Sequence, residues 1–317
     1  MKMNRIQFQP GLSMREFLER YGTEAQCRAA LQATRWPDGF VCPRCGGAAR
    51  TSFERGGLRY WQCGSCAHQC SLIAGTIFEA SKLPLSTWFM AMQLLTQSKN
   101  NVAALELMRL LGVSYSSAWL LKHKIMEAQR LAEEARELRG RVELDDSYLG
   151  GERSGGKPGR GSPNKVAFVA AVQASPGRKP ILACLNRQPH TSEEVAAFAA
   201  FHIAPSATVV SDGLWCFGAT TLIGAQHQRI VTGGGRASVA LPQFTAVNTL
   251  LSNLKTAISG TYHAFKFAKY AHRYLAELQF RFNRRFDMKT ILHRLLSALV
   301  AAPPCNERLL RAAEISR

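Results

Sequence analysis

The sequence predicts an α+β protein of several domains, because three kinds of pattern follow one another along the chain. Two Cys-x-x-Cys pairs lie between residues 42 and 66. Apolar residues then recur at helical spacing between residues 85 and 128. From Gly140 onward, short β-rich runs alternate with Gly and Pro, which is typical of an α/β or α+β domain. With 317 residues, 46% of them hydrophobic, the chain is long enough for two or three domains.

The composition favours nucleic acid as the partner. Lys and Arg number 40 against 22 Asp and Glu, which gives a formal net charge of +18. Such a surplus attracts polyanions over several ångströms, and a membrane surface is the weaker alternative. Residues 1–18 contain no apolar signal-peptide core, and no run of about 18 apolar residues occurs in the sequence. We therefore expect a cytoplasmic protein with no membrane partner.

The two Cys-x-x-Cys pairs predict a structural zinc site. Cys42 and Cys45 form the first pair, Cys63 and Cys66 form the second, and 17 residues separate the pairs. Tight turns of this kind present four thiolates that close a tetrahedron around Zn2+, which leaves no open position for catalysis. The alternative is a set of unrelated buried thiols. Cys70 does not fit a pair and is expected to be structural.

The segments on either side of the cysteine pairs are expected to be helical. Residues 13–32 predict two short amphipathic helices that break at Gly22, with Thr23 as the N-cap of the second. Beyond the cysteines, helices are predicted over Leu85–Gln97, Val102–Leu111 and Tyr115–Ala128. Gly112 ends the second of these helices, and Ser114 can cap the third.

The last two of these helices have the outline of a helix-turn-helix unit. A helix, a short turn with Gly, and a second helix is the order found in such units. Lys122 and Lys124 make the second helix basic and favour contact with DNA. The alternative is a helical connector whose Leu and Met residues only pack, since generic helical hairpins share the pattern.

Beyond Gly140 the pattern predicts three strands, a helix and a fourth strand. The strands are expected over Val142–Leu149, Val166–Gln173, Pro180–Leu185 and Ala207–Ser211. The helix is expected over Thr191–Phe201, with Glu194 completing a capping box. Asp145 lies on the first strand and Asp212 follows the fourth. This order, with carboxylates on the first and fourth strands, is that of an RNase H-like core.

Polar residues at strand ends mark the candidate catalytic site. Asp145, Asp212 and Asn248 each close or follow an apolar run, and Lys255 comes seven residues after Asn248. Strand ends that deliver carboxylates to one point are how a nuclease core holds divalent metal ions against a phosphodiester. If Asn248 begins a helix, Lys255 lies two turns along on the same face. The sequence therefore predicts a metal-dependent site for DNA strand transfer.

Only one of the adjacent residues Asp145 and Asp146 is expected to face this site. On a strand, Glu143 and Asp145 share a face, whereas Asp146 points to the opposite one. The residues alone leave the choice between Asp145 and Asp146 open.

Several stretches of the chain match one known family. They are the cysteine segment followed by GTIFEASKLPLSTWF, then VELDDSYLGGE, VVSDG, VNTLLSNLK, GTYHAFK and YLAELQFRFNRRF, and they extend from about residue 14 to residue 295. The chain in this respect resembles insertion-sequence transposases of the ISXO2-like group, which join an N-terminal zinc ribbon to a DDE-type nuclease domain whose third acidic residue is Asn. The resemblance implies a cut-and-join enzyme that uses Mg2+ or Mn2+. It also implies that the enzyme acts on the terminal inverted repeats of its element and on target DNA, as a homodimer or larger oligomer, in the bacterial cytoplasm with the nucleoid.

The resemblance assigns roles to the polar residues. Asp145 matches the first acidic position, Asp212 the second and Asn248 the third, while Lys255 matches the basic residue that follows. The two aspartates would flank the metal ions, and Lys255 would neutralise phosphate charge near the scissile bond.

The third metal ligand is open, because the amide of Asn248 supplies an oxygen but no charge. Glu277 is the rival ligand. It stands with Arg281 and Arg284 at positions i, i+4 and i+7 of a predicted helix, and the family carries the same stripe. The stripe is either a salt-bridged helix face that supports the site or a phosphate-binding surface made by the two arginines.

A Gly-rich loop follows the first catalytic strand. Residues 150–165 carry four basic residues, which are Arg153, Lys157, Arg160 and Lys165. We expect the loop to become ordered on the DNA backbone, and the alternative is a hairpin tip without function.

The patterns together predict five segments. These are an N-terminal helical segment (1–37), the zinc ribbon (38–75), a helical DNA-binding segment (76–137), an RNase H-like catalytic domain (138–296) and a C-terminal tail (297–317). The predicted function is that of a transposase that binds the ends of its insertion sequence. One competing class is a DNA-binding protein with an inactive nuclease fold, in which Asn248 reflects lost catalysis. Another is a zinc-ribbon transcription regulator, for which residues 1–135 would suffice.

Overall fold

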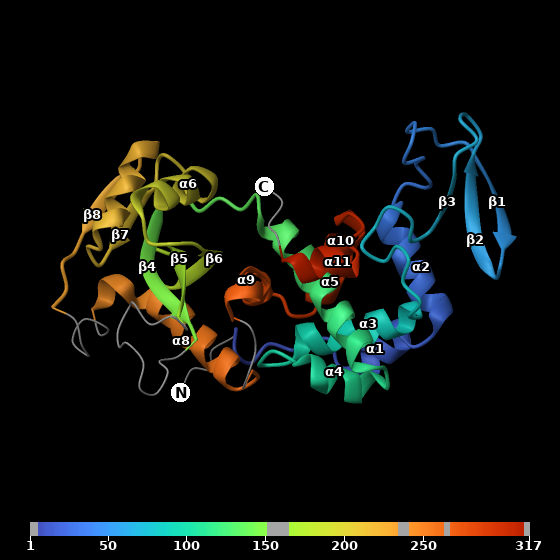
Figure 1. Ribbon diagram of the computed structural model, residues 1–317, viewed down its shortest axis with the longest axis horizontal. Helices are drawn as coiled ribbons and strands as arrows, with labels where there is room; N and C mark the ends of the chain where they lie inside the picture. The colour runs from blue at the N-terminus through green and yellow to red at the C-terminus, as the bar shows by residue number, and fades with distance from the viewer. Residues whose placement is uncertain (1–5, 151–164, 234–240, 263–266, 314–317) are drawn as a thin grey trace. The chain divides into compact units, whose positions relative to one another are not determined.

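The computed structural model divides into two compact units. It describes residues 6–150, 165–233, 241–262 and 267–313, drawn as a coloured ribbon in Figure 1. Unit 1 comprises residues 1–98, 102–129 and 285–317, and unit 2 comprises residues 99–101 and 130–284. Within the described ranges, no helix is long and apolar enough to cross a membrane.

Helices are the main regular elements of unit 1. Its helices are α1 (Met14–Tyr21), α2 (Glu24–Arg35), α3 (Leu85–Gln97), α4 (Ala104–Leu111), α10 (Ile291–Ala301), α11 (Glu307–Ala312) and the first part of α5 (Tyr115–Glu133). Ser13 and Thr23 begin α1 and α2 with capping boxes, in which side chain and backbone bond reciprocally. The predicted break at Gly22 and the predicted N-cap at Thr23 are therefore confirmed, and α3 has the predicted bounds.

The predicted helix, turn and helix is present as α4 and α5. Gly112 takes a left-handed conformation with φ of 65°, which a residue without a Cβ adopts most easily, and so ends α4. The Oγ of Ser114 then accepts the backbone N–H of Ser117 at 3.2 Å and caps α5. Two bounds differ from the prediction, since α4 begins at Ala104 and α5 continues to Glu133.

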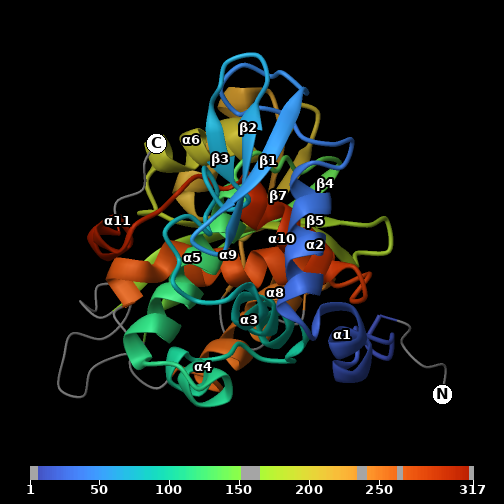
Figure 2. The ribbon, with the colours of Figure 1, turned by 90° about the vertical axis from the view of Figure 1, so that its right-hand side faces the viewer.

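The cysteine segment forms a small antiparallel sheet. Its strands lie side by side in the order β1 (Arg50–Arg55), β2 (Leu58–Cys63) and β3 (Gln69–Ser71) (Figure 2). Trp61 on β2 is only 3% exposed and packs edge-on against Trp36 at the end of α2, with ring centroids 4.9 Å apart. This contact attaches the sheet to the helices of unit 1.

Unit 2 is built on a five-stranded mixed sheet in the order β6-β5-β4-β7-β8. The strands are β4 (Arg141–Leu149), β5 (Val166–Ala174), β6 (Pro180–Arg187), β7 (Thr208–Ser211) and β8 (Gln226–Arg229). The first three strands in sequence pair antiparallel, and β7 pairs parallel to both β4 and β8. The four strands predicted beyond Gly140 are thus present, and β8 is an addition.

Helices cover both faces of this sheet. The helical elements of unit 2, besides the end of α5, are α6 (Ser192–His202), η2 (Trp215–Ile223), η3 (Pro242–Phe244), α8 (Thr245–Ser259) and α9 (Phe267–Arg284). One apolar core forms beneath α8 and α9, and a second forms beneath α6 and η2. Figure 1 shows α6 and α8 on opposite sides of the sheet. Successive residues of β4 therefore face different helices.

Candidate functional site

The acidic cluster lies where β7 ends beside the middle of the parallel strand β4. Leu144 on β4 is in register with Ser211, the last residue of β7, so Asp145 and Asp212 occupy the next position on each strand. Neighbouring parallel strands place their carboxyl ends at the same edge of a sheet. Carboxylate oxygens of Asp145, Asp146 and Asp212 lie within 4.8 Å of one another. The fold thus brings Asp145 and Asp212 together as the sequence predicted.

The position of Asp146 corrects the expectation that only one of the adjacent aspartates reaches the cluster. One of its oxygens lies in the cluster, and Oδ2 of Asp146 is also 3.7 Å from Nδ1 of His190. The physical reason is the end of β7 after Ser211, because β4 continues to Leu149 and, among the described strands, pairs there with β5 alone. A side chain there can turn around the free edge. Side chains of a strand still alternate between faces there, but at such an edge a carboxylate from the opposite face can reach the cluster.

The electrostatics of the cluster favour a bound cation. Burial raises the pKa of Asp145 to about 7, and the negative charges of Asp212 and Asp146 act in the same direction. The backbone N–H of Asp146 and the charge of Lys255 oppose this rise. Three crowded carboxylates form an oxygen-only donor set, which is the chemistry that Mg2+ and Mn2+ prefer. The residues present therefore fit a hard divalent cation.

Helix α8 carries the other two predicted site residues. Asn248 lies half-buried in its first turn, and the exposed Lys255 lies seven residues later on the same face. The charge of Lys255 acts on the Asp145 carboxyl. The face of α8 that bears Asn248 and Lys255 is therefore within electrostatic range of the cluster.

One residue of this region was missed as a functional candidate. Glu143 is fully buried on β4, and its Oε2 accepts the backbone N–H groups of Ala246 (2.8 Å) and Val247 (3.0 Å). Burial raises the pKa of Glu143, and these two N–H groups oppose the rise. The signal in the sequence was an acidic residue between Val142 and Leu144, two positions before Asp145 and on the same face.

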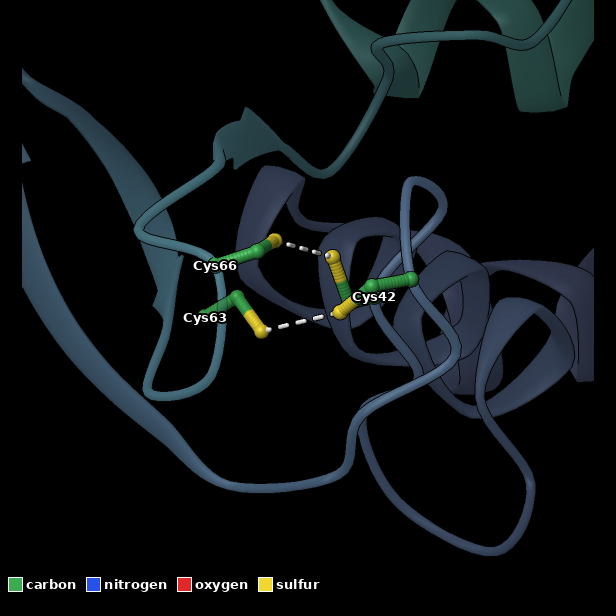
Figure 3. A group of neighbouring side chains, drawn as sticks. Cys42, Cys63 and Cys66 are labelled. Atoms are coloured by element: carbon green, nitrogen blue, oxygen red, sulfur yellow. Dashed lines mark hydrogen bonds between the residues drawn. The ribbon is translucent and has the colours of Figure 1, made fainter.

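The four predicted cysteines gather into one thiol cluster. Their Sγ atoms lie within 4.8 Å of one another, with Cys42 to Cys66 at 3.7 Å and Cys45 to Cys63 at 3.5 Å. Figure 3 shows the thiols of Cys42, Cys63 and Cys66 pointing toward one another. A tetrahedral Zn2+ with bonds of about 2.3 Å requires sulfur atoms about 3.8 Å apart, so the cluster fits a structural zinc.

The turn after β2 prepares one ligand for the metal. Backbone N–H groups of Cys66 and Ser65 lower the pKa of Cys63 to about 6, which favours the thiolate that binds zinc. Cys70 is buried on β3 but does not belong to the cluster of four. Its predicted structural role agrees with this position.

Two family models match the stretches of chain that contain the candidate sites. A family model described as a transposase zinc-ribbon domain matches residues 22–69, and one described as an ISXO2-like transposase domain matches residues 137–283. Residues 137–283 are thus similar to the ISXO2-like transposase domain. Over 135 residues, 42% of this chain, it is also 28% identical to an uncharacterized protein in transposable element ISH50 of Halobacterium salinarum. That match spans 44% of the relative, so the chain covers less than half of its length.

The two family matches enclose both candidate metal sites. The ISXO2-like domain includes Asp145, Asp212, Asn248 and Lys255, and the zinc-ribbon match includes all four clustered cysteines. The resemblance inferred from short motifs is confirmed.

The stripe on α9 of the ISXO2-like domain has internal partners. Glu277 is 1% exposed and accepts the Tyr262 hydroxyl at 3.1 Å, and it is not in the group of described acidic residues around Asp145. Arg281 donates to the carbonyls of Lys99 and Asn100 and to Oδ1 of Asn101.

The last residue of the stripe has internal partners as well. Arg284 contacts the buried Glu133 and donates to the carbonyl of Phe280. These contacts occupy the charged groups within unit 2. Metal ligation by Glu277 and DNA contact by Arg281 and Arg284 stay predictions. The alternative of a salt-bridged supporting face fits the structure.

Lys122 and Lys124, both outside the ISXO2-like domain, correct the prediction that α5 contacts DNA. Lys122 is 1% exposed, and its Nζ donates to the carbonyl of Val102 at 2.6 Å. Lys124 is 7% exposed, and its Nζ donates to the carbonyls of Ile77 (3.0 Å) and Glu79 (3.3 Å). Burial lowers the pKa of Lys124. Both lysines are buried and their ammonium groups bind backbone carbonyls, so neither can reach a DNA phosphate.

Replacing Lys122 by Ala tests whether this residue stabilises the fold or contacts DNA. We expect Lys122→Ala to lower the free energy of unfolding by about 1–3 kcal/mol, because the carbonyl of Val102 loses its buried donor. Thermal unfolding and the salt dependence of DNA binding measure the two effects. The matched control is Arg109→Ala, which removes an exposed charge from α4. A Lys122 variant with unchanged stability and a weaker salt dependence of DNA binding would contradict the structural role.

The predicted DNA-binding loop of the ISXO2-like domain is only partly described. Arg153, Lys157 and Arg160 lie outside the described residues, and Lys165 is half-buried immediately before β5. Contact between this loop and the DNA backbone stays a prediction.

Proposed function

We propose that the chain is a transposase that binds the ends of its insertion sequence and catalyses metal-dependent cleavage and strand transfer of DNA. The observation that carries this proposal is the convergence of Asp145, within β4, and Asp212, at the end of the adjacent parallel strand β7. Both lie in the ISXO2-like domain. The sheet order, with three antiparallel strands followed by two parallel ones, supports an RNase H-like catalytic domain.

Each residue of the site has a role in this proposal. Asp145 and Asp212 hold the divalent cations, and Asp146 offers a further oxygen. Mg2+ or Mn2+ bound there would activate the attacking oxygen and stabilise the leaving oxygen of the phosphodiester. Asn248 adds a neutral amide oxygen as the third ligand, and Lys255 neutralises phosphate charge beside the scissile bond. The ammonium of Lys255 is exposed and can meet a bound strand.

The zinc ribbon is a better candidate for DNA contact than helix α5, because Lys122 and Lys124 of that helix are buried. It presents four exposed arginines, which are Arg44, Arg50, Arg55 and Arg59. Such a surface contributes sequence-independent affinity through phosphate contacts. We retain the division into five segments proposed from the sequence, with the ribbon over residues 38–75 and the catalytic domain over residues 138–296. Joining two element ends requires at least two copies of the chain.

A strand-transfer assay on DNA that carries the element ends tests this function. The native chain with Mg2+ or Mn2+ should form joined product, whereas Asp145→Ala and Asp212→Ala should form none and still bind DNA. Absence of product from the native chain even with Mn2+, alongside retained DNA binding, would favour the inactive-nuclease alternative. Full function from residues 1–135 alone would favour the transcription regulator.

A further inference from the structure

Helix α8 begins without a cap of its own. Phe244 stands at its N-cap position, and no side chain there bonds to the first turn. The N–H groups of a first helical turn have no partner within the helix and need an acceptor when they are buried. Glu143, which is more than 100 residues earlier in the chain, supplies that acceptor for Ala246 and Val247. Its negative charge also lies at the positive end of the helix dipole.

A second residue of β4 holds the turn before α8. Arg141 donates from Nη2 to the carbonyl of Gln243 at 2.9 Å, and its Nε lies 3.8 Å from Oε1 of Glu143. The strand thus bonds to the chain on both sides of the helix start. Since Arg141 and Glu143 occupy alternate positions, they act from one face of β4.

The same strand and helix carry the catalytic candidates. Asp145 follows Glu143 by two positions on that face of β4, and α8 bears Asn248 in its first turn and Lys255 two turns later. A shift at the start of α8 would therefore move both residues relative to the acidic cluster. No other bond from β4 to the backbone N–H groups of α8 is found within the described residues.

Fold stability alone gives a weak reason for this arrangement. A fully buried carboxylate is costly, and Oε1 of Glu143 has no hydrogen-bond partner among the residues that the structure describes. A local Ser, Thr or Asp at residue 244 would cap α8 without burying a charge in the sheet. The bond from β4 instead fixes the helix to the strand that carries Asp145.

We propose that Glu143 is a positioning residue, which anchors the start of α8 to β4 and so holds Asn248 and Lys255 against the Asp145–Asp212 cluster. This inference rests on the proposed function and deepens it. Loss of the anchor should lower strand transfer about 10- to 100-fold, as loss of residues that orient metal ligands generally does. The amide oxygen in Glu143→Gln can still accept both N–H groups, so this variant should stay within about 3-fold of the native rate.

Glu143→Ala and Glu143→Gln are compared with Thr191→Ala as a matched control. Thr191 caps α6 on the other face of the sheet, where its Oγ1 accepts the N–H of Glu194 at 3.3 Å. Its loss weakens a helix start in the same unit without touching α8. The strand-transfer rate is measured at a temperature where thermal unfolding shows each variant to be folded. Glu143→Ala is also made in a Lys255→Ala background, because a residue that acts through α8 should lose most of its effect there.

Mn2+ binding gives a second readout, which needs no DNA reaction. It is monitored in zinc-loaded protein through the spectroscopic signal of the free Mn2+ ion. Glu143→Ala should weaken Mn2+ binding about 3- to 10-fold in the native background and much less in an Asn248→Ala background. Where the native chain forms product, a folded Glu143→Ala variant whose rate falls no more than that of Thr191→Ala overturns the inference. The inference is also overturned if the fold losses of rate caused by Glu143→Ala and by Lys255→Ala simply multiply in the double variant, because the two residues would then act independently. If the native chain forms no product, the proposed function fails. The positioning role is then judged by Mn2+ binding alone, and an unchanged Mn2+ affinity in Glu143→Ala overturns it.

Discussion

Replacing Asp145 by Asn is expected to lower strand transfer by about 10³-fold or more and, at the same time, to stabilise the metal-free protein. The catalytic loss follows from removing one of the two charges that hold the cations. The gain in stability follows from burial and from Asp212 and Asp146, which raise the pKa of Asp145 to about 7. Carrying this charge in the metal-free fold costs on the order of 2–4 kcal/mol at neutral pH and above.

The pH dependence of this effect has a definite sign. Below about pH 4 the carboxyl is protonated in both the folded and the unfolded state, since its ordinary pKa is 3.8. As the pH rises from about 4 to about 7, the unfolded chain releases the proton before the folded one does. The stability of the metal-free native protein should therefore fall over this range relative to Asp145→Asn.

Thermal unfolding across this pH range, without Mg2+ or Mn2+ but with zinc retained, measures the difference. Asp38→Asn is the control, because it makes the same chemical change at an exposed position in unit 1. Added Mg2+ should then stabilise the native protein more than Asp145→Asn. A variant no more stable than Asp38→Asn would show that the carboxylates are not crowded as the structure has them.

Replacing Cys63 by Ser is expected to release the zinc and to unfold the ribbon over residues 38–75. Structural zinc sites contribute on the order of 10 kcal/mol of folding free energy, and three thiolates do not close the tetrahedron. The small sheet β1-β2-β3 has few buried residues of its own, among them Trp61 and Cys70. Metal content per chain and protease sensitivity of the ribbon measure the loss. DNA binding should fall with it if the exposed arginines of the ribbon contact phosphate.

Cys70→Ala is the matched control for this substitution. Cys70 is buried in the same sheet but lies outside the cluster of four thiols. Its replacement should leave one zinc per chain. Loss of zinc from Cys70→Ala, or its retention by Cys63→Ser, would contradict the assignment of the ligands.

The parts of the fold that local patterns determine were predictable from the sequence. Thr23 begins α2 and Gly112 ends α4 because capping depends on only a few neighbouring residues. The convergence of Asp145 and Asp212 followed from the strand topology, since parallel pairing brings the end of β7 beside Asp145 on β4. The four cysteines could be grouped because their spacing is itself the signal.

The parts that depend on tertiary contacts were not predictable in the same way. Lys122 and Lys124 have a basic local pattern, yet they lie in a helix that the fold buries, where they donate to carbonyls of distant segments. Glu143 bonds to a helix start more than 100 residues away, and no local pattern reports such a contact. Asp146 reaches the cluster only because β7 ends before β4 does. In each case the deciding partner is remote in sequence.

The most direct test of the metal-site assignment is the position of Mn2+, located by anomalous X-ray diffraction from crystals of the chain bound to DNA with its element ends. The structure predicts peaks within coordination distance of the carboxylates of both Asp145 and Asp212, with the Asn248 amide as the further protein ligand and none at Glu277. Mn2+ bound at Glu277, or absent from the pair Asp145 and Asp212 while DNA occupies the domain, would contradict the assignment.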